Sequence, residues 1–225
     1  MTDYRFIRNF VYLIGGRAQK TGADTGIMRL WAMLFRWRAE ARSRGDAFTF
    51  IMPREWNDSV REMAALLQRH SVPARDRRVI IAGYSWGAGF GAPRLAREVK
   101  RAGAIVDLLI LIDPIYRSKL PLAFRLLAFT TWFGIRIPAN VKEVLIYRQR
   151  RDALKGTRVR LDDRHRTRIL ADTDLTPAGV THHSIQYHVP MLRECFDRIR
   201  GLFAGATSHR PGTPHFRGGL PSCRG

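Results

Sequence analysis

Short apolar runs alternate with longer amphipathic segments along most of this 225-residue chain, and this alternation constrains the fold more than any other feature. The clearest apolar run, at 106–112, is nearly continuous, which is typical of a strand covered on both faces. Similar runs predict strands at 10–14, 47–51, 79–83 and 144–147, and a weaker run predicts one at 168–170. Strands that alternate with helices predict a mainly parallel sheet with helices on both sides.

The amphipathic segments carry start and stop signals of helices. Helical spacing of apolar residues predicts a helix over about 27–41, with Asp24 or Thr25 as its N-cap. Ser59 opens a capping box ahead of the next apolar stripe. A last helix is predicted over about 190–201, between a proline and a glycine.

These elements predict one domain over residues 1–204, a three-layer α/β/α sandwich with a mainly parallel six-stranded sheet. Residues 205–225 are rich in Gly, Pro, Arg and His and lack periodicity, so we expect a disordered tail. A lid-like insertion is expected at about 115–138, where an apolar and aromatic stretch contains Arg125 and Arg136. It would either pack on the sheet or cover the site and meet anionic lipid headgroups.

Composition excludes several classes of protein. Two cysteines, Cys195 and Cys223, are too few for a disulfide framework or a Cys-rich zinc site. No apolar run is long enough for a transmembrane helix, and residues 1–10 lack the pattern of a secretory signal. We therefore expect a cytoplasmic protein.

The net charge is unusually high. Lys and Arg number 39 against 19 Asp and Glu, which gives +20 and favours anionic partners. The basic residues are scattered and do not interleave with aromatic residues, which argues against nucleic acid as a partner. A compositional bias explains the charge most simply, and weak association with an anionic membrane surface is the alternative.

The sequence GYSWG at 83–87 begins at the end of the strand predicted at 79–83 and forms a G-x-S-x-G motif. A serine on a sharp strand-to-helix turn needs small neighbours, because the turn is strained and the backbone passes close to other strands. This geometry would expose the Ser85 hydroxyl and aim the Trp86 amide at a developing oxyanion. The alternative is a structural turn serine. Further glycines and Pro93 predict that the following helix starts late or is kinked.

A serine nucleophile needs a base, and the base needs a carboxylate to orient it. Asp113 ends the predicted strand at 106–112, where side chains enter the crevice of a parallel sheet, and Asp152 is the alternative acid. His182 and His183 are candidate bases, and as neighbours they point in different directions, so only one can serve. The histidines lack the spacing of metal ligands, so we expect no metal and no cofactor.

Together these residues resemble the α/β-hydrolase superfamily, in its compact cutinase- and lipase-like form, over roughly residues 10–199. The resemblance rests on GYSWG, on the Leu-Ile-Asp-Pro turn at 111–114, and on the late histidine, in the order Ser, Asp, His. Such relatives commonly show His-x-x-Ile at the catalytic histidine, which matches His182 to Ile185 and favours His182 over His183.

The resemblance implies acyl transfer, with Ser85 as nucleophile, His182 as base and Asp113 as the acid that orients the imidazole. It also implies oxyanion donors at the Trp86 amide and at the loop around Gly16 or Arg17. The implied enzyme is a serine hydrolase of carboxylic esters or thioesters with a hydrophobic acyl substrate, either a small molecule or a lipid.

Two other function classes remain open at this stage. One is a catalytically degenerate protein of this fold that binds a partner. The other is a basic nucleic-acid-associated protein, which would be retained on DNA or RNA with steep salt dependence.

Overall fold

The computed structural model describes residues 7–17, 19–43, 49–69, 73, 77–115, 134–152 and 154–204. Most of the predicted lid-like insertion, 116–133, and the whole predicted tail, 205–225, lie outside the described residues.

A six-stranded sheet forms the middle of the molecule, and every pair of neighbouring strands in it is parallel. The order across the sheet is β2-β1-β3-β4-β6-β8. The strands are β1 (Asn9–Ile14), β2 (Thr49–Arg54), β3 (Arg78–Tyr84), β4 (Val106–Ile112), β6 (Val141–Arg148) and β8 (Arg168–Asp174). The predicted strands all form, and the weakest of them, at 168–170, begins a seven-residue strand.

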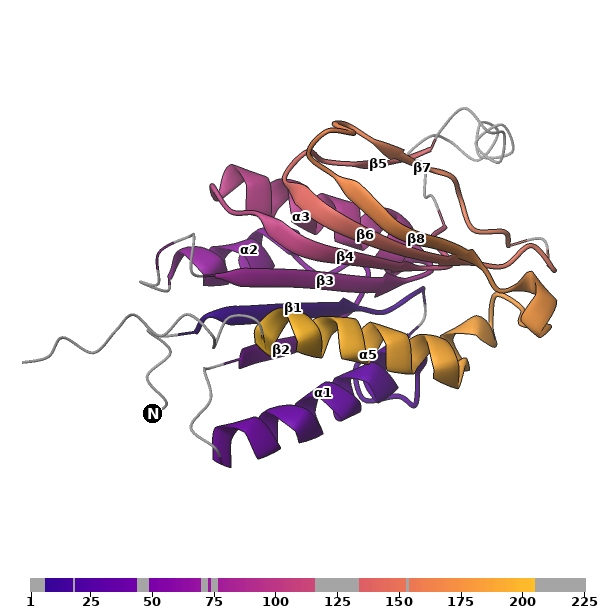
Figure 1. The fold of residues 1–225 in the computed structure, drawn as a ribbon, viewed down its shortest axis with the longest axis horizontal. Coiled ribbons are helices and arrows are strands. Elements are labelled where there is room, and N and C mark those ends of the chain that lie inside the picture. Colours follow the sequence, from indigo (N-terminus) through magenta and orange to yellow (C-terminus); the bar gives the residue numbers. More distant parts are fainter. Residues whose placement is uncertain are drawn as a thin grey trace, which may run out of the picture.

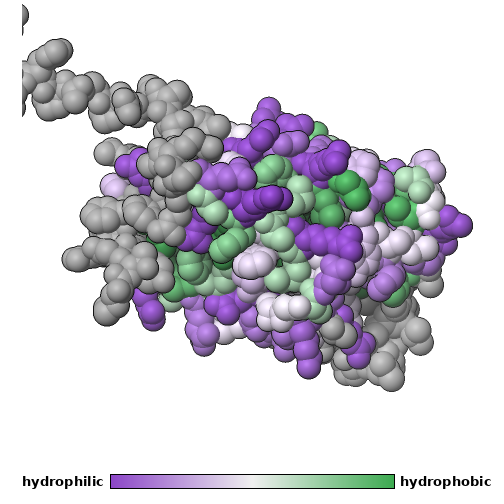
Figure 2. Space-filling model, turned by 90° about the horizontal axis from the view of Figure 1, so that it is seen from below, coloured by the Kyte–Doolittle hydropathy of each residue, from purple (hydrophilic) through white to green (hydrophobic). Residues whose placement is uncertain are grey.

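Helices cover both faces of this sheet (Figure 1). On one face lie α2 (Val60–Gln68) and α3 (Ala92–Arg101), and on the other lie α1 (Gly26–Ser43) and α5 (Val189–Ala204). The chain is therefore an α/β protein whose parallel sheet is flanked by helices, as expected for a three-layer sandwich. Seen from the α1 and α5 side, apolar side chains lie among hydrophilic ones (Figure 2), and Phe35 and Val189 are about half exposed there.

The strand pattern in the sequence follows from burial on both faces. In β1, Phe10, Tyr12 and Ile14 join the core formed with α2 and α3, whereas Val11 and Leu13 join the core formed with α1 and α5. Since alternate side chains of one strand enter two different cores, the strand has no polar face, and its sequence is continuously apolar.

The predicted helix starts are confirmed by their caps. The Thr25 hydroxyl accepts a hydrogen bond from the Met28 N–H at the start of α1, whereas Asp24 pairs with Arg29. At the start of α2, the Ser59 hydroxyl accepts a hydrogen bond from the Glu62 N–H. Each such cap satisfies an N–H that has no partner inside the helix.

Two features of the fold differ from the prediction. The short strands β5 (Ile135–Ile137) and β7 (Val159–Leu161) pair in a second sheet, and three residues are too few to show a periodicity. Also, α5 continues past Gly201 to Ala204. A glycine weakens a helix by only about 1 kcal/mol, which tertiary packing of the same helix outweighs.

The direction in which the chain adds strands reverses between β1 and β3. From β1 the chain passes through α1 to β2 on one side, and β3, β4, β6 and β8 extend the sheet on the other side. The connections that leave β1 and β3 therefore diverge to opposite faces. Parallel sheets bind ligands in the crevice at the carboxyl ends of the strands at such a point.

Candidate active site

Ser85 lies immediately after β3 on a strained turn. Its φ is 54°, in the left-handed region, which costs a non-glycine residue roughly 1–2 kcal/mol. Main-chain hydrogen bonds hold this conformation: the Ser85 N–H donates to the Ile112 carbonyl (2.9 Å), and the Ser85 carbonyl accepts from Gly89 (2.8 Å) and Ile115 (3.0 Å). The turn is thus fixed both by the end of β4 and by the segment after it.

The two glycines of the motif sit where no side chain fits. A Cβ at Gly83 would lie 2.7 Å from the Ala88 nitrogen, and a Cβ at Gly87 would lie 2.3 Å from the Ile14 carbonyl oxygen. The G-x-S-x-G pattern therefore reflects close backbone approach on both sides of Ser85.

The helix after Ser85 does not start late: helical conformation begins at Trp86, and the irregularity that the glycines and the proline predict lies within the helix. A π-helical segment, η3 (Gly87–Gly91), precedes α3, and Pro93 occupies the first turn of α3. Because η3 runs directly into α3, Pro93 lies inside a continuous helical segment, and it has no N–H to donate to the preceding turn. Single π-helical turns are frequent at functional sites.

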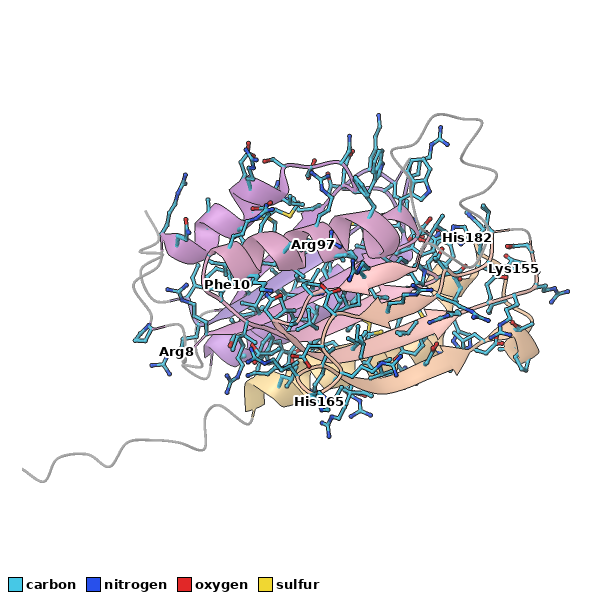
Figure 3. The ribbon with its side chains drawn as sticks, turned by 90° about the horizontal axis from the view of Figure 1, so that it is seen from above. Arg8, Phe10, Arg97, Lys155, His165 and His182 are labelled. Carbon is cyan, nitrogen blue, oxygen red and sulfur yellow. The ribbon has the colours of Figure 1, made fainter. Side chains whose placement is uncertain are left out.

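Ser85, His182 and Asp113 form one hydrogen-bonded chain. His182 Nε2 lies 2.9 Å from Ser85 Oγ, and His182 Nδ1 lies 2.6 Å from Asp113 Oδ2. With Nδ1 donating to the carboxylate, Nε2 is left to accept the hydroxyl proton. Figure 3 shows His182 at the end of the sheet opposite Arg8 and Phe10.

Asp113 follows β4 and is fully buried. Its N–H donates to the Tyr147 carbonyl (2.7 Å), which ties the residue to β6. Besides the imidazole, its carboxylate accepts from the side chain of Gln149 (2.9 Å) and, more weakly, from the Gln149 N–H (3.4 Å). Hydrogen bonds of this kind compensate the cost of burying a carboxylate.

The alternative acid and the alternative base lie outside this chain of contacts. Asp152 Oδ2 accepts from the main-chain N–H of His182 (2.7 Å), so it contacts the backbone of the histidine and not its ring. His183 is exposed and meets the Tyr187 ring edge-on, with centroids 5.9 Å apart. The structure therefore brings His182 and Asp113 to Ser85 and leaves Asp152 and His183 in other positions.

Tyr84 supports His182 in a way that sequence reasoning missed. The two rings stack with centroids 5.2 Å apart, and the Tyr84 hydroxyl donates to the His182 carbonyl (2.6 Å). Burial raises the pKa of Tyr84 above its usual value, so the hydroxyl remains a neutral donor at physiological pH. The middle residue of G-x-S carried no signal that would reveal this contact.

Gly16 and Arg17 approach the serine from the end of β1. A Cβ at Gly16 would lie 3.0 Å from Ser85 Cβ, so the glycine allows this close approach. The Gly16 N–H already donates to the Gln19 side chain (2.8 Å). The Arg17 guanidinium lies over the Trp86 ring, 4.8 Å from its centroid, and brings the two residues side by side.

Two glutamines that sequence reasoning missed hold this loop. The Gln19 amide also donates to Oε1 of Gln186, a buried residue that follows His182 by four positions. Gln186 Oε1 accepts in addition from the Gly26 N–H at the start of α1 (3.1 Å). The loop after β1 is thus hydrogen-bonded to the segment that carries the histidine.

An aromatic cluster extends from the serine turn. Trp56 meets Trp86 edge-on, with centroids 5.0 Å apart, and lies 6.3 Å from the Phe90 ring. All three side chains are partly exposed. They add apolar surface to this rim of the site.

A cavity of about 390 Å³ lies elsewhere, between α2 and α3. Its lining includes four arginines, Arg61, Arg94, Arg97 and Arg101. Ser85, Asp113 and His182 do not line it. It is therefore separate from the hydrogen-bonded chain.

Among the residues that the structure describes, no group of three His, Cys, Asp or Glu side chains is placed to hold a metal ion. Over the same part of the chain, no helix is both long and apolar enough to cross a membrane.

Cys195, in α5, is expected to resist modification in the folded protein. It is fully buried, and burial raises the pKa of its thiol to about 12, whereas an exposed cysteine ionises near pH 8.5. Because the thiolate is the reactive form, iodoacetamide at pH 8.5 should modify a Cys223→Ser variant only after unfolding. Intact mass with and without denaturant measures this, and rapid modification of the folded protein would contradict it.

Comparisons with protein-family models, with curated proteins and with solved structures found no match to this chain. The interpretation of the site therefore depends on its own geometry.

Proposed function

We propose that this chain is a serine hydrolase of the α/β-hydrolase superfamily that cleaves carboxylic ester or thioester bonds through an acyl-enzyme. The observation that carries the proposal is the hydrogen-bonded chain from Ser85 Oγ through His182 to the buried Asp113, with distances of 2.9 and 2.6 Å. The strained serine turn after a central parallel strand supports it, as does the position of this turn at the reversal between β1 and β3.

In the proposed reaction, Ser85 Oγ attacks the carbonyl carbon of the substrate while His182 Nε2 takes the hydroxyl proton. Asp113 stabilises the imidazolium that forms. The tetrahedral intermediate then expels the alcohol or thiol, which receives the proton from His182, and the acyl group stays on Ser85. A water molecule then attacks this acyl-enzyme while His182 takes its proton, and His182 returns that proton to Ser85 Oγ as the carboxylic acid leaves.

The proposed oxyanion donors are main-chain amides on the two sides of the crevice. One is the Trp86 N–H, at the residue after the nucleophile. Because the Gly16 N–H already donates to Gln19, we assign the second donor to the N–H of Arg17. Stacking of the Arg17 guanidinium on Trp86 supports this assignment, since it holds the two residues together. Such preorganised donors contribute most where water is excluded.

The proposed substrate has a hydrophobic acyl group, in a small molecule or a lipid. The partly exposed Trp56, Trp86 and Phe90 support this choice, because they supply apolar surface next to Ser85. The net charge of +20 supports weak association with an anionic membrane surface. A cytoplasmic location is part of the proposal, and the free, buried Cys195 is compatible with a reducing compartment.

Covalent labelling with a fluorophosphonate probe tests the proposal directly. Folded wild-type protein should gain the mass of one phosphonyl group, with fluoride as the leaving group, and Ser85→Ala should gain none, because only an activated serine reacts readily with this probe. A panel of acyl esters and acyl thioesters of increasing chain length would then define the substrate.

Three other results would each overturn the proposal in a different way. No labelling of folded wild-type protein would favour a catalytically degenerate binding protein. Equal labelling of Ser85→Ala would place the reactive residue elsewhere. Tight and steeply salt-dependent retention on DNA or RNA, without labelling, would favour the nucleic-acid alternative.

A further inference from the structure

We propose that Gln149 and Asp152 are positioning residues of this site: Gln149 holds the carboxylate of Asp113, and Asp152 holds the main chain of His182. The inference rests on the proposed function and adds to it two residues that do not contact Ser85. It also gives Asp152 a role different from that of an alternative acid.

Gln149 lies directly after β6 and is fully buried. Its Nε2 lies within hydrogen-bond distance of three oxygens: Asp113 Oδ2 (2.9 Å), Asp152 Oδ1 (3.0 Å) and the Leu154 carbonyl (2.8 Å). Its Oε1 accepts from the N–H groups of Arg151 (2.8 Å) and Asp152 (3.2 Å).

These partners determine the orientation of the Gln149 amide. A flipped amide would turn its oxygen toward two carboxylates and its NH₂ toward two N–H groups, so every contact would become repulsive. Gln149 is therefore a neutral donor held between the carboxylates of Asp113 and Asp152. A neutral donor in this position offsets the like-charge repulsion between two partly or fully buried anions.

Asp152 completes a closed ring of hydrogen bonds. Its Oδ2 accepts from the His182 N–H, its Oδ1 accepts from Gln149, Gln149 donates to Asp113, and Asp113 binds the His182 imidazole. His182 is thus held at its backbone and at its ring by the same small network. Holding both ends keeps Nε2 at the distance from Ser85 Oγ that proton transfer requires.

The first test replaces the donor without changing the shape of the side chain. Gln149→Glu puts a third carboxylate between Asp113 and Asp152, so the rate constant for fluorophosphonate labelling and kcat on p-nitrophenyl acetate should fall about 100-fold at pH 8. KM should change little, because the substrate does not contact this residue. Gln68→Glu, the same chemical change at the exposed end of α2, should leave both quantities unchanged.

The pH dependence of this loss separates positioning from a general structural role. Once protonated, the carboxyl group introduced by Gln149→Glu would again offer a donor, so the ratio of wild-type to variant rate should shrink as the pH falls from 8 toward 5.5. Among the described residues, the charged or titratable side chains around position 149 are Asp113 and Asp152, which Gln149 contacts, and beyond them His182, Tyr84 and Arg148, which interact with those carboxylates. Of the nearby guanidinium groups, that of Arg151 donates to the Gly179 carbonyl and that of Arg148 pairs with Asp172.

Gln149→Met is the second variant, because it fills nearly the same volume and has no donor at any pH. Its labelling rate constant and kcat should fall by a similar factor at pH 8, and the ratio of wild-type to variant rate should not shrink at low pH. Asp152→Asn keeps one acceptor oxygen and should retain more activity than Asp152→Ala.

The outcomes distinguish this inference from the proposed function. If wild-type protein is not labelled at all, the proposed function fails. If wild-type protein is labelled and Gln149→Glu and Gln149→Met, both shown to be folded, are labelled at the same rate, only the positioning role is wrong. Asp152→Asn as inactive as a variant without Asp113 would return Asp152 to the role of an acid.

Discussion

His182→Ala is expected to lower ester hydrolysis and fluorophosphonate labelling by about 10⁴-fold or more, the usual cost of removing the base from a catalytic triad. His183→Ala is expected to keep nearly full activity. The physical reason is geometric: His182 Nε2 lies 2.9 Å from Ser85 Oγ, whereas the exposed His183 contacts Tyr187. Without the imidazole, the hydroxyl proton has no acceptor as the nucleophile attacks.

The adjacent histidines make this a matched comparison, since both variants lose the same side chain from the same short loop. Second-order rate constants for labelling and for p-nitrophenyl acetate hydrolysis provide the measurement. Added imidazole should restore part of the activity of His182→Ala, because it can enter the space left and accept the proton. Loss of activity in His183→Ala with an active His182→Ala would show that the base is misassigned.

Gly87→Ala is expected to destabilise the fold by about 3 kcal/mol or more, at the upper end of the cost of overpacking. The added Cβ would lie 2.3 Å from the Ile14 carbonyl oxygen and 2.4 Å from that of Gly15. Both are main-chain atoms at the end of β1, so neither can move aside without shifting a central strand. The serine turn would shift with them, and labelling of Ser85 should fall as well.

Gly201→Ala in α5 is the matched control. Among the described residues, no atom outside the adjoining helix backbone lies within 4 Å of the added Cβ, and the position is inside a helix, so alanine should stabilise the protein by about 1 kcal/mol. Urea denaturation followed by circular dichroism gives both values from the shift of the midpoint. A Gly87→Ala variant as stable as wild type would contradict the close packing of β1 against the serine turn.

Most of the fold could be predicted from the sequence, because the signals for strands and helices are local. Apolar runs and N-caps such as Thr25 and Ser59 depend only on neighbouring residues, and the predicted strands and helices all form. The pairing of β5 with β7 was missed, since it joins two segments of three residues each, which are too short to show a periodicity. The end of α5 was also missed, because packing outweighed the preference of Gly201.

The candidate nucleophile was likewise readable from the sequence. Glycines on both sides of a serine after an apolar run predict a tight turn. Glycine is required at Gly83 and Gly87 because a Cβ there would collide with neighbouring backbone. From the residues alone, two acids and two bases remained open as partners of Ser85. The resemblance favoured His182 over His183, and the position of Asp113 at the end of a strand, together with the resemblance, favoured Asp113 over Asp152.

Only the tertiary structure decided which of these side chains meet. His182 follows Ser85 by 97 positions and Asp113 by 69, so their contacts depend on the order of the strands and on the path of the loop after β8. The same holds for Tyr84, Gln19, Gln149 and Gln186, whose roles arise from hydrogen bonds to residues far away in the sequence. Local sequence determines which conformations a segment prefers, whereas packing of the whole sheet determines which distant side chains come within hydrogen-bond distance.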